Sequence, residues 1–378
     1  MKKKIIRLSK SCISNYEKVA VQDVLDREYL GMGEDVQNFE NALSVFFNSP
    51  VVCVNSGTAA LHLALQACGV GFGDEVLVPS ITYVASFQAI SATGAKPIAC
   101  DINPETLLLD IKDAEKRITT KSKAIMPVHY SGSAGDIKSI YKFANKNKLR
   151  VIEDAAHAFG SSINDKLVGS FGDVICFSFD GIKNITSGEG GCIVTKDETV
   201  LKKIRDARLL GVKKDTEKRY LGERSWDFDV TEQGWRYHMS NIMAAIGQEQ
   251  LKRFPKFAAR RQNIAKMYDR LLLNNSSIYT FSRDYNEIVP HIYVIRINGM
   301  INRKIIQHDM LEEGVQVGYH YQPNHWLSFY KDEKALPLPI SDIIFPELMS
   351  LPLHFDILDS DIEFVVKTLC KIVKKHNA

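Results

Sequence analysis

Residues 177–191 read Phe-Ser-Phe-Asp-Gly-Ile-Lys-Asn-Ile-Thr-Ser-Gly-Glu-Gly-Gly, the most informative stretch of the chain. An apolar run ends at Phe179, and Lys183 follows among small, flexible residues. A lone lysine most often lies on an exposed loop. This setting instead favours a pocket, where partial desolvation lowers the pKa of the amine and makes it a nucleophile toward carbonyl groups. Other parts of the chain supply what a lysine-bound pyridoxal phosphate (PLP) needs.

The first of these parts is residues 149–158, Leu-Arg-Val-Ile-Glu-Asp-Ala-Ala-His-Ala. The pattern predicts a short buried strand with Asp154 at its carboxyl end, the end where ligands bind in open α/β sheets. PLP acts as an electron sink only while its ring nitrogen stays protonated, and a buried carboxylate beside that nitrogen keeps it so. Asp154 is the candidate carboxylate. A helix N-cap is the alternative, because aspartate is common at strand-to-helix turns.

The second part is residues 51–65, Val-Val-Cys-Val-Asn-Ser-Gly-Thr-Ala-Ala-Leu-His-Leu-Ala-Leu. This pattern predicts a strand, a turn of small residues and then a helix. Free backbone N–H groups and the helix dipole make the start of a helix an anion site. Gly57 lets the backbone approach a phosphate closely, and Ser178 can add a hydroxyl. The segment therefore predicts a phosphate site.

Together these segments resemble the sugar-nucleotide aminotransferases of the type I PLP fold, the DegT–StrS group, over nearly the whole chain. Six segments match in order: Ser56–Leu61, Pro79–Ser86, Glu153–Ala158, Lys183 with residues 188–191, Gly318–Pro323 and Leu351–His354. The resemblance implies an α/β protein with the type I aminotransferase fold. In that fold a large domain, with a mostly parallel mixed sheet flanked by helices, is joined to a smaller C-terminal α+β domain.

The resemblance also implies a role for each matching residue. Lys183 would be the catalytic, Schiff-base lysine, and Asp154 would pair with the ring nitrogen. Tyr83 would stack on the cofactor ring, and His157 would contact the phenolic oxygen of the ring. The implied phosphate-binding residues are Gly57, Thr58 and Ser178, and the implied substrate-binding residues are Asp180, Glu189, His320 and Tyr321.

Two positions depart from the family pattern. The family usually carries Gly-Tyr-Asn-Tyr-Arg-Met where this chain has Gly-Trp-Arg-Tyr-His-Met at residues 234–239. Arg236 thus replaces the asparagine that reaches the cofactor phosphate of the neighbouring subunit, and its charged fork can keep that role. We therefore expect a homodimer with shared active sites. Asp180 stands where the family often has histidine, which leaves a contact with a substrate hydroxyl as its expected role.

Composition agrees with this interpretation. The chain has 378 residues, 25% of them charged, and a formal net charge of +3. It can hold two domains, and its balanced charge gives no sign of a nucleic-acid groove. No apolar stretch approaches the ~18 to 20 residues of a membrane span. Lys10 cuts short the apolar stretch that follows the basic start, so we do not expect residues 1–14 to be a signal peptide. The seven cysteines form no Cys-x-x-Cys pair. We expect Cys53, Cys100, Cys176 and Cys192, which lie in apolar runs, to be reduced core residues, and we expect a cytoplasmic protein without a metal site.

Short apolar runs alternate with helical patterns, which predicts a mostly parallel sheet with helices on both faces. The expected strands are residues 51–54, 75–79, 97–100, 124–128, 151–153, 174–178 and 192–195. The composition shifts near Pro255, so we divide the chain into a PLP-binding large domain, residues 1–250, and a small C-terminal domain, residues 251–378. The expected elements of the small domain are helices over 258–273, 303–313 and 359–375 and a strand over 291–297.

The resemblance implies transfer of an amino group from L-glutamate to the keto carbon of a nucleotide-linked sugar. The run that follows Lys183 resembles members that act at sugar C4. Members that act at C3 more often carry Lys-Asn-Leu-Gly and an aspartate in the glycine run. The nearest likeness is to the dTDP-4-keto-6-deoxyglucose 4-aminotransferases, which make dTDP-viosamine for the O-antigens of lipopolysaccharide. GDP-perosamine and UDP-4-amino-sugar synthases, and C3 enzymes, remain alternatives.

Other classes fit the sequence less well. A dehydratase of this fold would carry histidine in place of Lys183. A non-catalytic regulatory relative would have little reason to keep Lys183, Asp154 and His157 together. A nicotinamide-dependent dehydrogenase would carry a Gly-x-Gly-x-x-Gly turn after one of the first strands, and the chain has none there.

Overall fold

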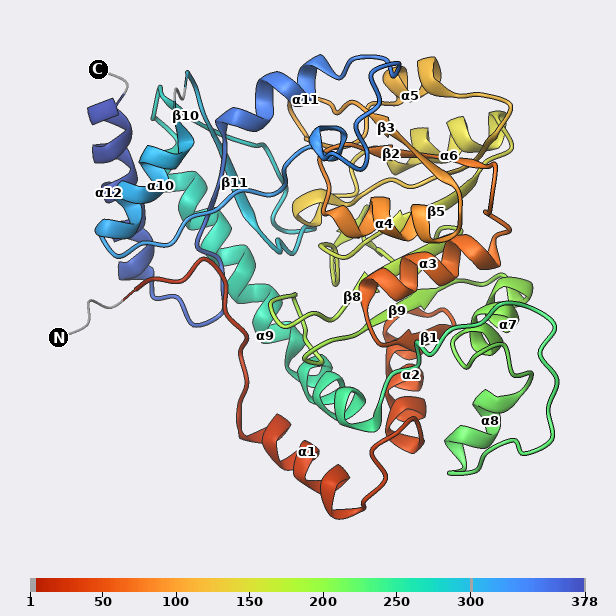
Figure 1. Ribbon diagram of the computed structural model, residues 1–378. Coiled ribbons are helices and arrows are strands. Elements are labelled where there is room, and N and C mark those ends of the chain that lie inside the picture. Colours follow the sequence, from red (N-terminus) through yellow and green to blue (C-terminus); the bar gives the residue numbers. More distant parts are fainter. Residues whose placement is uncertain (1–4, 300–301, 377–378) are drawn as a thin grey trace.

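A computed structural model describes residues 5–299 and 302–376 of the chain (Figure 1). Residues 1–4 belong to the segment that we do not expect to be a signal peptide, and they lie outside the described part. The centre of the large lobe is a seven-stranded sheet with the strand order β1-β9-β8-β5-β4-β2-β3. The strands are β1 (Val51–Val54), β2 (Glu75–Pro79), β3 (Lys96–Cys100), β4 (Ser122–Ile125), β5 (Arg150–Asp154), β8 (Val174–Ser178) and β9 (Gly191–Val194).

All seven expected strands exist, and the predicted α/β sheet is confirmed. Strands β3, β2, β4, β5 and β8 run parallel, whereas β9 is antiparallel to both of its neighbours. The expected strand over 124–128 is wrong at its end, because β4 stops at Ile125. Pro127 has no N–H with which to continue the ladder.

Helices cover both faces of this sheet because successive residues of each buried strand point to opposite faces. Val52 and Val54 pack with α3 (Gly57–Ala67), α4 (Val84–Ala92) and α7 (Glu198–Ala207). Val51 and Cys53 face the other way, toward α2 (Glu34–Phe47). The same face is covered farther along by α5 (Ile111–Arg117) and α6 (Ile137–Lys146). The remaining elements of this lobe are α1 (Asn15–Asp26), the hairpin β6 (Ser162–Ile163) and β7 (Lys166–Leu167), and α8 (Asp215–Tyr220).

The long helix α9 (Asn241–Leu272) corrects the expected helix over 258–273. It begins 17 residues before the predicted start at residue 258 and continues through Pro255. A proline costs one hydrogen bond inside a helix and usually ends it. Here α9 packs against α1 and α2 at one end and against α12 at the other, so tertiary burial holds it together. It also crosses residue 250, so the division there stays a prediction.

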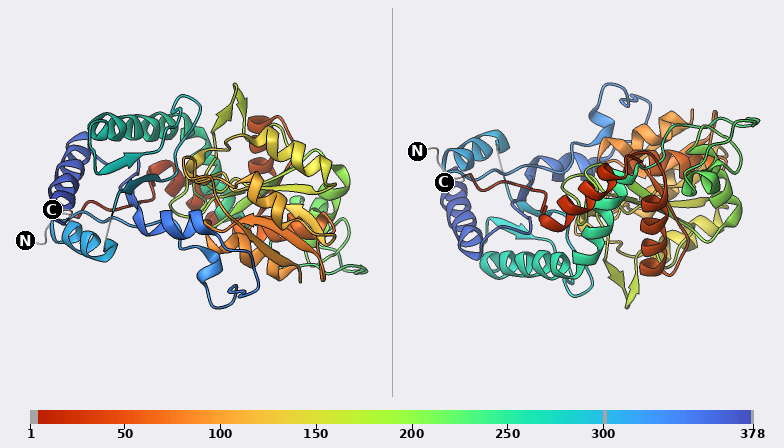
Figure 2. Two further views of the ribbon diagram at one scale, coloured as in Figure 1. Left: turned by 90° about the horizontal axis from the view of Figure 1, so that it is seen from above. Right: turned by 90° about the horizontal axis from the view of Figure 1, so that it is seen from below.

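The small lobe is a three-stranded antiparallel sheet with helices on it (Figure 2). Its elements are β10 (Ile278–Thr280), β11 (Tyr293–Ile297), β12 (Leu348–Leu351), α10 (Arg303–Glu312) and α12 (Asp359–His376). Their apolar faces form a core separate from those of the large lobe. The expected strand over 291–297 begins at Tyr293, which leaves His291 just outside the sheet.

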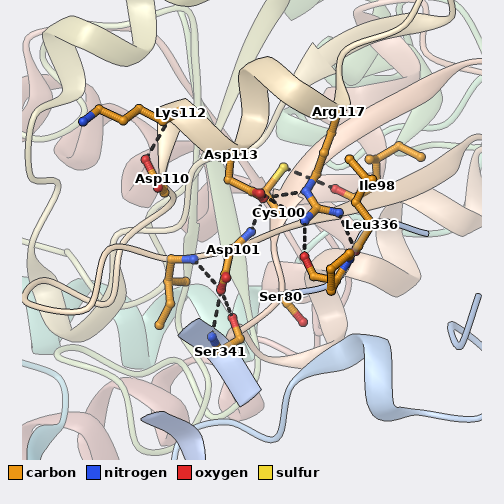
Figure 3. A network of polar contacts seen from close by, with 12 residues as sticks. Ser80, Ile98, Cys100, Asp101, Asp110, Lys112, Asp113, Arg117, Leu336 and Ser341 are labelled. Carbon is orange, nitrogen blue, oxygen red and sulfur yellow. Dashed lines mark hydrogen bonds and ion pairs between the residues drawn. The ribbon is translucent and has the colours of Figure 1, made fainter. Parts of the chain in front are cut away.

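The segment 318–345, called the strap here, crosses from the small lobe back to the large one. Its helix α11 (Pro339–Ile344) is held by a buried network (Figure 3). Asp101 accepts hydrogen bonds from the backbone N–H of Ser341 at 2.8 Å and from that of Ile340 at 2.9 Å, so it caps α11 from another element. Arg117 donates to the carbonyls of Leu336 and Pro337 at 3.0 and 2.8 Å. The strap is therefore fixed at its far end.

Two further findings concern the described residues alone. No helix among them is long and apolar enough to cross a membrane. Their cysteines are all free, and the four expected in the core, Cys53, Cys100, Cys176 and Cys192, are buried.

Candidate active site

A cavity of about 410 Å³ lies at the carboxyl ends of the parallel strands. Strand β5 ends at Asp154, and β8 ends at Ser178, directly before the lysine loop. The cavity is lined by every predicted site residue except Arg236, namely Gly57, Thr58, Tyr83, Asp154, His157, Ser178, Asp180, Lys183, Glu189, His320 and Tyr321. Residues more than 260 positions apart in the sequence thus meet in one place.

Lys183 lies in the loop after β8, where its backbone N–H donates to the carbonyl of Asp180 at 3.0 Å. Its Nζ is 3.5 Å from Nε2 of His291. Burial lowers the pKa of Lys183 to about 8, although the nearby carboxylates of Asp154 and Asp180 act in the opposite direction. More of the amine is therefore neutral near pH 8 than for an exposed lysine, and the neutral amine is the nucleophile.

This pKa leads to a kinetic prediction. Cofactor-free protein mixed with PLP should form the covalent link faster as the pH rises, by about tenfold per unit, up to a plateau just above pH 8. The sign follows from the lysine, which must lose its proton before it attacks the aldehyde. Stopped-flow absorbance measures the rate, with Lys183→Ala as the blank. A rate that keeps rising beyond pH 10, as expected for an unperturbed lysine, would contradict the assignment.

Asp154 is buried and has well-defined partners. Its Oδ2 accepts from the Ser86 hydroxyl at 2.7 Å, and its Oδ1 accepts from the backbone N–H of Ala156 at 3.2 Å. Ser86 in turn lies 2.9 Å from the hydroxyl of Thr82. The alternative role of Asp154 as a helix N-cap would require a helix directly after β5. A turn follows β5 instead, so this alternative is wrong. Each carboxylate oxygen thus accepts one hydrogen bond, and Asp154 lines the cavity.

Three histidines, His157, His291 and His320, line the described cavity. The sequence pattern did not predict His291 as a site residue. Nδ1 of His157 accepts from the backbone N–H of Ser131 at 3.3 Å, so the proton of its neutral ring is on Nε2, which donates to the Tyr321 hydroxyl at 2.9 Å. Burial, reinforced by Lys183, lowers the pKa of His157 and His291 well below the usual range, and that of His320 to about 4. All three are therefore neutral at pH 7. His291 lies just before β11, far from Lys183 in the sequence, so only the tertiary structure brings it to the cavity.

The start of α3 forms an anion site against β8. A Cβ added to Gly57 would lie 2.8 Å from Cβ of Ser178, so no side chain fits there. Ser56 caps the helix by accepting from the N–H of Ala59. The N–H groups of Gly57 and Thr58 have no hydrogen-bond partner within residues 5–299 and 302–376. The Ser178 hydroxyl accepts from the N–H of Asp180, which leaves its own proton to donate. These residues fit the phosphate of PLP.

Aromatic and acidic side chains also line the cavity. Tyr83 is 58% exposed, and its ring centroid lies 5.4 Å from that of Tyr321. Burial, and then the charge of Asp180, raise the pKa of Glu189. Among the described residues that line the cavity, three are acidic and Lys183 is the single cation. The cavity of one chain is thus net negative.

Arg236 lies outside this cavity. Its backbone bridges to Leu209, and its carbonyl accepts from the Asn55 side chain at 3.4 Å. Its guanidinium is exposed and makes neither a hydrogen bond nor an ion pair with any residue that the structure describes. It lines a separate, smaller pocket with Arg219 and His238. One chain alone does not bring Arg236 to the phosphate site.

Comparison with known proteins identifies the class. Residues 11–370 match the DegT/DnrJ/EryC1/StrS aminotransferase family. The spore coat polysaccharide biosynthesis protein SpsC of Bacillus subtilis is 34% identical over 94% of this chain and 93% of its own. The PLP form of the putative sugar aminotransferase Spr1654 of Streptococcus pneumoniae superposes with a TM-score of 0.91 and 30% identity, over 98% of this chain and 99% of its own. PseC of Helicobacter pylori, an aminotransferase involved in the biosynthesis of pseudoaminic acid, gives 0.91 and 27%, over 98% and 100%.

The fold is that of a type I PLP-dependent aminotransferase, and PLP is the cofactor. The chain belongs to the DegT/DnrJ/EryC1/StrS family and is a sugar aminotransferase.

Proposed function

We propose that the enzyme transfers the amino group of L-glutamate to C4 of a nucleotide-linked 4-keto-6-deoxy sugar, with dTDP-4-keto-6-deoxy-D-glucose as the first candidate. The observation that carries the transferase part is Lys183, an amine of lowered pKa that shares one cavity with Asp154 and the start of α3. The choice of C4 rests on the likeness of residues 183–191 to C4-acting members. A role in O-antigen or another surface polysaccharide has support from the similarity to SpsC, a spore coat polysaccharide protein.

In this proposal the residues divide the work. PLP, when bound, supplies an electron sink for negative charge at the carbon that loses a proton. Nζ of Lys183 takes the proton from the α-carbon of the donor and holds it for return, as general base and then acid. Asp154, whose carboxylate is held in place by Ser86, would keep a positive charge on the ring nitrogen. His157, whose Nε2 donates to the Tyr321 hydroxyl, would offer this N–H to the phenolic oxygen of the ring.

We assign the sugar contacts to the acidic and small-lobe residues. Carboxylates accept hydrogen bonds from hydroxyl groups, so Asp180 and Glu189 suit a polyhydroxylated substrate. His320 is fixed by the Ser350 hydroxyl, 2.7 Å from its Nδ1, which leaves Nε2 free to face the sugar. Tyr83 and Tyr321, whose ring centroids lie 5.4 Å apart, add apolar ring surfaces to the cavity.

A substrate panel tests the proposal. Purified enzyme is given glutamate with the dTDP-, UDP- and GDP-linked 4-keto-6-deoxy sugars and with a 3-keto isomer, and the products are identified by NMR. We expect amination at C4 and the highest kcat/KM with the dTDP sugar. Preference for a GDP or UDP sugar would support the perosamine-type or UDP alternative, and amination at C3 would overturn the choice of carbon.

We also propose a homodimer with shared active sites. The cofactor phosphate, glutamate and the nucleotide diphosphate are all anionic, yet the described residues of one chain offer the cavity a single cation. A buried phosphate needs more than backbone dipoles to offset its desolvation. Arg236, exposed and without a partner in the described chain, suits the phosphate bound by Gly57, Thr58 and Ser178 of the other subunit. The seven free cysteines fit a cytoplasmic location.

Mixed dimers should reveal the shared site. Lys183→Ala chains and Arg236→Ala chains are each expected to be weak, but a hybrid holds one site with both lesions and one with neither. Random mixing should restore about one quarter of wild-type activity, because half the dimers are hybrids with one intact site.

The control pairs Lys183→Ala with Asp154→Ala. Both residues line the cavity of their own chain, so every hybrid site is damaged and activity should stay low. Recovery in neither mixture, with hybrids verified by mass spectrometry, would mean that Arg236 does not serve the partner's site.

A further inference from the structure

The strap contacts the cofactor cavity through His320 and Tyr321 and then passes over the turn that precedes α4. Asn324 joins the strap to this turn and is completely buried, with 0% exposure. Its backbone N–H donates to the carbonyl of Ser80 at 3.0 Å. Its side-chain Nδ2 donates to the same carbonyl at 3.0 Å and to the carbonyl of Thr82 at 2.8 Å.

The chemistry of this contact requires an amide. Both Nδ2 hydrogens of Asn324 are used on carbonyl oxygens, whereas its Oδ1 has no partner among the residues described. Leaving a buried acceptor without a partner costs free energy. We therefore attribute the asparagine at this position to the two hydrogen bonds that its Nδ2 donates. An ionised aspartate of the same shape would bring a carboxylate against two carbonyls.

A second contact runs alongside. Nδ1 of His325 lies 2.7 Å from the Ser80 hydroxyl, and its Nε2 lies 2.9 Å from the carboxylate of Asp342 in α11. The turn is thus held between Asn324, His325 and the fixed end of the strap. The strap and the turn therefore form one hydrogen-bonded unit.

From this turn a chain of contacts leads into the cofactor cavity. The Thr82 hydroxyl lies 2.9 Å from that of Ser86, which donates to Asp154 at 2.7 Å. Tyr83, the next residue of the turn, faces the cavity with its ring 5.4 Å from that of Tyr321. The turn thus carries the aromatic ring of Tyr83 and the Thr82 hydroxyl, which contacts the Ser86 hydroxyl of α4 that orients the carboxylate.

We infer that Asn324 is a positioning residue for the cofactor. It does not line the cavity. By holding the carbonyls of Ser80 and Thr82 it fixes Tyr83 and, through the Thr82 hydroxyl, the Ser86 hydroxyl that donates to Asp154. The affinity for PLP therefore depends on a side chain of the strap.

Asn324→Ala tests this inference against Ser341→Ala as a matched control. Ser341 is also completely buried in the strap, but its hydroxyl bonds to Asp101, which does not line the cavity. Two quantities are measured for each purified protein: the dissociation constant of PLP, from absorbance titration after the cofactor is removed, and the melting temperature without cofactor. We expect both variants to have a lower melting temperature than wild type. Only Asn324→Ala should bind PLP about tenfold more weakly.

Equal PLP dissociation constants in wild type, Asn324→Ala and Ser341→Ala would overturn the inference and leave Asn324 a structural residue. An equal loss of PLP affinity in both variants would do the same, since any damage to the strap would then suffice.

Asn324→Asp provides a second measurement if the alanine variant does not fold. Its protonated carboxyl can donate one hydrogen bond and its ionised form none. The PLP dissociation constant, divided by that of wild type at each pH, should therefore fall as the pH is lowered. A ratio that stays at one across the pH range would overturn the inference.

Discussion

Lys183→Ala should abolish transamination, with a loss of at least about 10³-fold in kcat, because one side chain serves as both nucleophile and proton carrier. The described cavity holds no other lysine that could take over either task. Lys183→Arg should fail as well, since an arginine keeps the charge but does not give up its proton. Steady-state turnover with glutamate and a keto sugar measures the effect.

The loss must come from chemistry and not from cofactor release. The start of α3 and Asp154 remain in the variant, so PLP should still bind, but without the absorption band of the lysine-bound form. Borohydride treatment should fix the cofactor on Lys183 in wild type, as located by peptide mass spectrometry, and nowhere in Lys183→Ala. Transamination above a trace by the alanine variant would overturn the central assignment.

Asp154→Ala should lower kcat by about 10²- to 10³-fold even when the enzyme is saturated with PLP. The Ser86 hydroxyl of α4 donates a hydrogen bond to the Asp154 carboxylate and holds it in one orientation. Without this carboxylate the ring nitrogen loses its proton more readily, and the electron sink weakens. Single-turnover rates with glutamate, at several PLP concentrations, separate this effect from weaker binding.

Asp154→Asn is the matched variant, because it keeps the shape and removes the charge. We expect it to behave like the alanine variant in rate while it retains more of the stability. Ser86→Ala should cost much less, since it removes one hydrogen bond to a carboxylate that remains. Wild-type rates in Asp154→Asn would mean that the carboxylate serves only the local turn to Ala156.

Five strands of the large sheet, β1, β2, β5, β8 and β9, could be predicted because they are buried on both faces over almost their whole length and read as apolar runs. The residues after β5 and β8 could be named because their chemistry stands out: an acid at a strand end, and a lysine among glycines. The failures are local. Pro255 suggested a helix boundary, yet α9 continues through it because both halves are buried against other helices.

The sequence by itself determined the fold class, the cofactor and the candidates for the lysine, the carboxylate and the phosphate turn. Each depends on short-range order, in which a few neighbouring residues carry both the local geometry and the chemistry. The tertiary structure decided what depends on distant segments. It brought His291 to Lys183, set Ser86 on Asp154, tied Asn324 to the turn of Tyr83 and left Arg236 outside its own cavity. Spacing along the chain carries no information on such contacts, because they form only when two lobes and a strap pack around one cavity.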